Sequence, residues 1–138
     1  MALTNSKNTT TGRTNYITVP MAASTKIYAG ACVCADASGN AVNAANTSGL
    51  KFLGVASATV DNSAGLAAAI NITIQSVQAI ETLILKGSSV DKTWRGKLVY
   101  FTDEETVTTT AGNAVIAGVV VDALSATTVA VDPHRTAA

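Results

Sequence analysis

Hydrophobic and polar residues alternate in short runs along this chain, with the period of two that is typical of a half-buried β-strand. The clearest run is 70–75, where Ile70, Ile72 and Ile74 alternate with Asn, Thr and Gln. By the same pattern we expect strands at 16–19, 26–35, 50–60, 77–85, 97–101, 106–109, 115–122 and 127–132. The sequence allows one short helix at most, at 64–69 or at 89–95. Short strands separated by frequent turns predict an all-β fold, a small β-sandwich or barrel.

Two segments of the chain share the same order of glycines, apolar runs and polar turns. Residues 30–55 and 96–119 each open with Gly and a short apolar run, pass through a polar turn, and close with an apolar strand that Gly54 or Gly118 interrupts. The opening and closing glycines lie 24 residues apart in the first segment (30 to 54) and 22 in the second (96 to 118). A unit this short cannot bury its own apolar face, so the two must pack together. The repeat therefore predicts a scaffold built around a duplicated strand–turn–strand unit.

Composition indicates a protein that works in contact with others. Hydrophobic residues make up 48% of the 138, aromatic residues 4% and charged residues only 13%. Nine basic and nine acidic residues give zero formal charge, which provides no basic field for nucleic acid or an anionic membrane. A neutral surface with few charges repels neighbouring molecules weakly. Such a surface suits a protein docked in an assembly, and we expect neither a nucleic-acid nor a membrane partner.

The chain divides into an arm and one domain. Residues 1–15 are almost entirely polar and offer little to bury, so we expect a flexible N-terminal arm. Such an arm is either a plain disordered terminus or a segment that becomes ordered on a partner. Residues 16–138 form the β-rich domain. The start of the chain lacks the apolar stretch of a signal peptide, and no run of about 18 apolar residues occurs, so we expect synthesis in the cytoplasm without export.

Residues that could perform chemistry are scarce. The single histidine, His134, lies in the tail, where nothing would hold it as a catalytic base. Cys32 and Cys34 project from the same face of a strand; they could supply two of the four ligands of a zinc site, but small buried hydrophobes are the simpler interpretation. The acidic run 103–105 is a solvated turn or a weak cation site. We therefore expect no enzyme, and no catalytic, metal or cofactor site.

Trp94 is the one aromatic residue for which the sequence leaves two roles open. It stands beside Arg95, and a tryptophan next to basic residues can anchor an interface. Alternatively, it covers a core in which large aromatic side chains are rare.

The second repeat carries a resemblance to a known family. Its strand 99–103 with the aromatic pair Tyr100-Phe101, its turn Thr109-Thr110-Ala111-Gly112-Asn113 and its strand Ile116-Ala117-Gly118-Val119 follow one another in an order similar to that of tailed-bacteriophage capsid decoration (cement) proteins. Ala117 between Ile and Gly departs from that pattern. The resemblance covers roughly residues 16–132 and consists of turns and strands.

The resemblance implies a virion structural protein, made in the host cytoplasm, that decorates the outer capsid surface and stabilises the head by bridging capsid subunits. It implies two partners, the major capsid protein and further copies of the chain, as a homotrimer in preference to a dimer. The alternative is a head fibre, receptor-binding or tail structural module of a phage. Residues expected to contact the capsid or another partner lie in the arm, in the first strand and beside the tryptophan: Leu3, Thr4, Lys7, Arg13, Tyr16, Ile17, Trp94 and Arg95.

Overall fold

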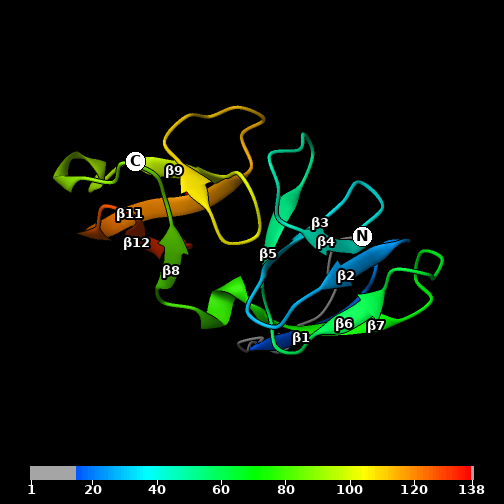
Figure 1. The fold of residues 1–138 in the computed structure, drawn as a ribbon. Helices are drawn as coiled ribbons and strands as arrows, with labels where there is room; N and C mark the ends of the chain where they lie inside the picture. The colour runs from blue at the N-terminus through cyan, green and yellow to red at the C-terminus, as the bar shows by residue number, and fades with distance from the viewer. Residues whose placement is uncertain (1–14, 138) are drawn as a thin grey trace, which may run out of the picture.

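The computed structural model describes residues 15–137, whose regular secondary structure is almost entirely β-strand (Figure 1). These residues form two five-stranded antiparallel sheets and a two-stranded ribbon. Within the described range there is no α-helix, and the only helical elements are two 3₁₀ helices, η1 (Val77–Ala79) and η2 (Lys92–Trp94). The expected all-β fold is confirmed.

The first sheet and the ribbon form what we call the first lobe. Its strand order is β4-β3-β5-β7-β1, with all neighbours antiparallel. The bounds of these strands are β4 (Ala41–Asn43), β3 (Cys32–Ala35), β5 (Lys51–Ala56), β7 (Asn71–Ser76) and β1 (Tyr16–Pro20). The ribbon pairs β2 (Thr25–Ile27) with β6 (Val60–Asn62) and lies against this sheet.

The second sheet, which forms the second lobe, repeats the arrangement of the first. Its order is β10-β9-β11-β12-β8, again antiparallel throughout. The bounds are β10 (Val107–Thr108), β9 (Leu98–Phe101), β11 (Ile116–Ser125), β12 (Thr128–Asp132) and β8 (Leu83–Lys86). Each strand thus corresponds to one in the first lobe, so the duplication covers five strands in each lobe rather than the single strand–turn–strand unit visible in the sequence.

Both sheets curl so that their two edge strands meet at one end. An isolated parallel bridge joins Met21, after β1, to Ala41 at the start of β4. The corresponding bridge in the second lobe joins Lys86, at the end of β8, to Thr106 just before β10. Each lobe is therefore a sheet rolled towards a small barrel, and closed by a single bridge.

Two glycines hold the same place in the two sheets. Gly54 pairs with Val33 and Gly118 pairs with Val99, and each lies beside an irregularity in the ladder between its strand and the neighbouring one. Their φ angles are +157° and +149°. A Cβ atom at Gly54 would overlap the backbone carbonyl oxygen of Gln75, and one at Gly118 would overlap that of Asp132. Only glycine permits the close approach of the next strand at these points.

The buried hydrophobic residues form two clusters, and the larger one joins the lobes. The smaller cluster fills the first lobe with Met21, Ile27, Ala31, Val33, Ala41, Ala56, Ile72 and Ile74. The larger cluster fills the second lobe, including Trp94 and Phe101, and also takes in Cys32, Cys34 and Ala44 from the first. The strand β3 is buried on both faces and supplies side chains to both clusters.

Contacts between the lobes join corresponding parts of the duplication. The turn after β4 meets the turn after β10, where the Asn113 N–H donates to Asn46 Oδ1 (2.9 Å) and Asn113 Nδ2 donates to the Asn46 carbonyl (2.7 Å). The residues that follow β7 and β12 also meet, with His134 Nε2 2.8 Å from the Val77 carbonyl oxygen. In both contacts, corresponding segments of the two lobes meet each other, which is the pattern of an interface with two-fold symmetry.

The structure corrects three of the predicted strands. The run 26–35 is broken at Gly30, whose φ of +86° turns the chain between β2 and β3. The run 50–60 is likewise two strands, β5 and β6, in different sheets. The run 77–85 begins as the helix η1, capped by the Ser76 hydroxyl, before β8 starts at Leu83. The short helix allowed at 89–95 is present as η2, whereas 64–69 contains only turns.

Candidate interaction surfaces

The outer edge of β1 carries backbone groups that the sheet does not use. The Asn15 carbonyl accepts from the Ser76 N–H (2.8 Å) and the Met21 N–H donates to the Ile70 carbonyl (2.9 Å). Because hydrogen-bonding direction alternates along an antiparallel strand, Ile17 also faces β7, while residues 16 and 18 direct their N–H and C=O groups to the outer edge. Among the described residues, no strand pairs with that edge.

The side chains of β1 leave this edge open to a partner. Tyr16 is 60% exposed and Thr18 is exposed, whereas Ile17 and Val19 pack against the smaller cluster. Natural edge strands are commonly protected by charges, bulges or proline. Between Tyr16 and Val19 there is no charge and no bulge, and Pro20 protects only the end near the parallel bridge.

The corresponding strand of the second lobe, β8, has a similar edge. Ile84 occupies the position of Thr18, and its side chain is 61% exposed. The end of β8 is covered, since the Lys86 N–H donates to the Glu105 carbonyl (2.8 Å) and Lys86 Nζ pairs with the Glu105 carboxylate at 2.9 Å. The uncovered part of this edge is therefore shorter than in β1.

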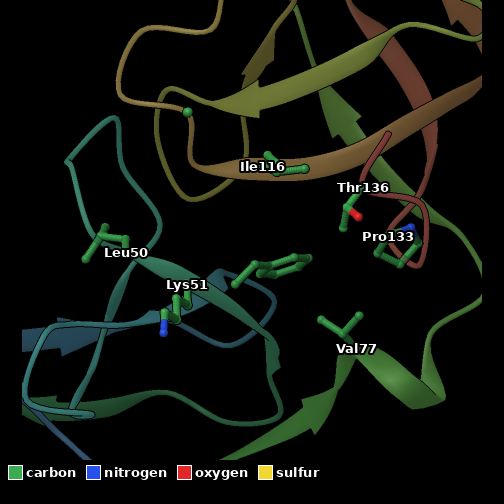
Figure 2. Close-up of a pocket in the computed structure, with 8 residues that line it drawn as sticks. Leu50, Lys51, Val77, Ile116, Pro133 and Thr136 are labelled. Atoms are coloured by element: carbon green, nitrogen blue, oxygen red, sulfur yellow. The ribbon is translucent and has the colours of Figure 1, made fainter. Parts of the chain in front are cut away.

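A groove of about 350 Å³ lies between the lobes (Figure 2). It is lined from both sides by Leu50, Lys51, Phe52, Val77, Ala114, Ile116, Pro133 and Thr136. Since Gly54 corresponds to Gly118, Phe52 corresponds to Ile116, so the groove lies where the two halves of the duplication face one another. The Phe52 ring also packs edge-on against Phe101, with centroids 4.9 Å apart.

The chemistry of the groove is that of an apolar contact surface. Most of its lining side chains are hydrophobic, and the polar ones are Lys51 and Thr136. Its volume is at the lower end of the range for small-ligand sites, which also need several convergent polar groups. In Figure 2, Lys51 extends away from Pro133 and Thr136 and therefore belongs to the rim. The groove suits apolar side chains of a peptide.

The structure separates the residues that the sequence singled out. Tyr16 and Ile17 are together on β1, while Leu3, Thr4, Lys7 and Arg13 lie outside the described residues. Trp94 is 8% exposed and packs in the larger cluster, which supports its interpretation as a cover of the core. Arg95 beside it is exposed and donates from Nε and Nη2 to the Asp122 carboxylate, at 2.9 and 2.7 Å.

The cysteines behave as small hydrophobes. Cys32 and Cys34 are free and buried on the same face of β3, and burial raises the pKa of each thiol to about 12. The nearby acidic turn, Asp103 and Glu104, adds to this shift at Cys32, whose N–H donates to the Glu104 carbonyl (2.9 Å). Within residues 15–137 no three metal-ligating side chains come together.

Sequence reasoning missed the groove and the edge position of Ile84. The lining residues come from four separate segments, so no local pattern could have joined them. Ile84 fell inside a run predicted as one continuous strand, and only the strand order shows that β8 is an edge.

Comparison with known proteins gives no further assignment. No family model matches the chain, and neither a curated protein nor a solved structure matches it significantly. None of the helices in the described part of the chain is long and apolar enough to cross a membrane.

Proposed function

We propose that this protein is a virion structural protein that decorates the outer surface of a phage capsid and stabilises the head by bridging capsid subunits. Its partners are the major capsid protein and further copies of itself, in a trimer. The observation that carries the proposal is the edge of β1 with which no strand of residues 15–137 pairs, together with the corresponding edge of β8.

An edge of this kind binds a partner by adding a strand. The backbone groups of Tyr16 and Thr18 provide hydrogen bonds, and the exposed Tyr16 ring provides contact area. Because β1 and β8 are equivalent edges on different lobes, one molecule can contact two neighbours. Several weak contacts in one oligomer dissociate slowly through avidity, which is how a small protein can reinforce a large shell.

The proposal is tested by co-sedimenting the full-length protein with empty mature heads of the phage that encodes it. We expect saturable binding with a fixed copy number per capsid subunit. Thr18→Lys should weaken binding roughly tenfold or more, because a lysine on an edge strand opposes strand addition. Thr110→Lys, at an exposed position in the turn after β10, is the matched control and should bind as the parent does.

Two results would contradict the proposal. Binding that Thr18→Lys leaves unchanged would remove β1 from the interface. Failure to bind heads, combined with binding to host cells or location at only a few sites per particle, would instead assign the chain to a fibre, receptor-binding or tail module.

A further inference from the structure

We propose that the peptide bond between Asp132 and Pro133 is a self-cleavage site, at which the Asp132 carboxyl group attacks the main-chain carbonyl carbon of its own residue. The products are a chain that ends at Asp132 and a short segment that starts at Pro133. The reaction concerns this chain alone and does not depend on the function proposed above.

The chain contains this one Asp–Pro bond, because its other proline, Pro20, follows Val19. An aspartate carboxyl group that attacks its own carbonyl carbon closes a five-membered ring, so the two reacting groups are already parts of one residue. The nitrogen of a proline peptide bond carries no hydrogen and is part of a tertiary amide. It is more basic than an ordinary peptide nitrogen and accepts a proton more readily as it leaves.

The fold holds the attacking carboxyl group beside the bond to be broken. Asp132 Oδ1 accepts a hydrogen bond from the His134 N–H at 2.9 Å, and the ring that this hydrogen bond closes includes the bond between Asp132 and Pro133. His134 is fixed in turn, because its Nε2 lies 2.8 Å from the Val77 carbonyl oxygen on the other lobe. Unfolding would release both constraints, so the carboxyl group is positioned only in the folded protein.

The carbonyl group under attack is polarised by the neighbouring strand. The Val120 N–H donates to the Lys97 carbonyl on the β9 side (2.9 Å), so by the alternation along β11 the N–H of Val119 points to β12, where its partner is Asp132. Gly118 permits this approach, since a Cβ atom there would overlap the Asp132 carbonyl. A backbone N–H aimed at this oxygen stabilises the negative charge that develops on it during attack.

The reaction balances without any group from outside except water. In the neutral form of the Asp132 carboxyl group, a carboxyl oxygen bonds to the carbonyl carbon, the bond from that carbon to the Pro133 nitrogen breaks, and the carboxyl proton passes to the nitrogen. The chain then ends in a cyclic anhydride, and Pro133 has a free amine. Water opens the anhydride to two carboxyl groups, and the Asp132 side chain is 29% exposed, so water reaches it.

Cleavage would alter the interface between the lobes. Pro133 and Thr136 line one side of the groove, and both belong to the released segment. His134, which holds the Val77 carbonyl from the other lobe, leaves with them. The groove therefore opens on that side once the bond is broken.

The test follows the intact mass of the full-length protein at the lowest pH at which its circular dichroism is still native. We expect loss of the segment that starts at Pro133, roughly tenfold or more faster than in the urea-unfolded chain at the same pH, because only the fold positions the carboxyl group. Added hydroxylamine should react with the anhydride and leave a hydroxamate at residue 132.

Two variants and one control complete the design. Asp132→Asn keeps the acceptor for the His134 N–H but removes the acidic proton, and should abolish cleavage. Pro133→Ala keeps the carboxyl group and should slow cleavage roughly tenfold, because an ordinary peptide nitrogen is the poorer leaving group. Asp122→Asn, which removes a carboxylate paired only with Arg95, should cleave as the parent does.

Three results would overturn the proposal. An intact folded protein would exclude the reaction, and equal rates in the folded and unfolded chains would reduce it to ordinary acid lability. Cleavage that Asp132→Asn leaves unchanged, or that gives no hydroxamate, would show that water attacks the bond without the carboxyl group.

Discussion

Successive side chains of β3 enter different cores. Cys32 and Cys34 point into the cluster shared with the second lobe, while Val33 between them is fully buried in the first lobe. No position on this strand from 32 to 34 faces solvent, so each side chain is limited in size and polarity by packing on its own face. A small apolar thiol satisfies that limit without any reactive role.

Because the two thiols are buried, the free energy of unfolding should change with pH in the alkaline range. The pKa of each is raised from 9.0 to about 12, mainly by burial, so the folded state keeps its protons where the unfolded state loses them. Stability should therefore fall as pH rises above about 9, by up to about 1.4 kcal/mol per pH unit for each thiol. Urea unfolding at about pH 8 and about pH 10 measures this slope.

The control for this prediction is the double variant Cys32→Ala, Cys34→Ala. All other ionisable groups are common to the parent and the variant, so the difference between their two slopes of unfolding free energy against pH isolates the cysteines. If the free energy of unfolding changes with pH equally in the parent and the variant, the thiols are not shielded from water in the folded state.

At the scale of the elements, the duplication rests on two matched irregularities in the sheets. At Gly54 on β5 and Gly118 on β11 a Cβ atom would overlap the backbone of the next strand, and both have backbone angles that favour glycine. These positions restrict the register of three strands in each sheet, β3, β5 and β7 in the first and β9, β11 and β12 in the second, because a shift by one residue would turn every side chain to the opposite face.

Replacing one of these glycines should destabilise the fold more than backbone strain alone. Gly54→Ala places a methyl group onto the Gln75 carbonyl and should lower the free energy of unfolding by about 1–3 kcal/mol beyond the strain. Gly39→Ala is the control, since its φ is +83° but the space around it is open, and it should cost about 1 kcal/mol. Denaturant unfolding compares the two, and equal costs would mean that β7 moves aside freely.

Local patterns were enough to predict most of the strands but not their connections. The alternation at Ile72 and Ile74 and the paired glycines follow from short-range chemistry, and the structure has both. The break at Gly30 was missed because an apolar run looks continuous when one left-handed residue turns it, and β4 was missed because three residues give too short a pattern.

The candidate surfaces were harder to predict than the strands for a related reason. Tyr16 and Ile17 could be named because they follow the arm directly in sequence. The groove and the exposed edge at Ile84 depend on which segments lie side by side, and no spacing along the chain encodes that.

Considered as a whole, the molecule is two similar lobes that share a core. The larger cluster includes residues from both, and the turns at Asn46 and Asn113 add hydrogen bonds between them. A lobe separated from the other would expose the face of β3 that carries the two cysteines. This shared burial argues that neither lobe is stable without its partner.

The protein should therefore unfold in one cooperative transition. Trp94, the only tryptophan, reports on the second lobe, and far-ultraviolet circular dichroism reports on both sheets. The two signals should give the same midpoint in a denaturant titration. A tryptophan transition displaced from the circular dichroism transition would show that the lobes unfold separately.

The contacts between corresponding segments of the two lobes indicate how such a chain can arise. Contacts of this symmetry are equally available to two separate polypeptides of half the length, whose pairing would then depend on their concentration. Fusing the two genes end to end makes that pairing intramolecular and independent of dilution. Once joined, the halves no longer need to be interchangeable, and each can acquire its own additions: the ribbon in one, the helix that carries the tryptophan in the other.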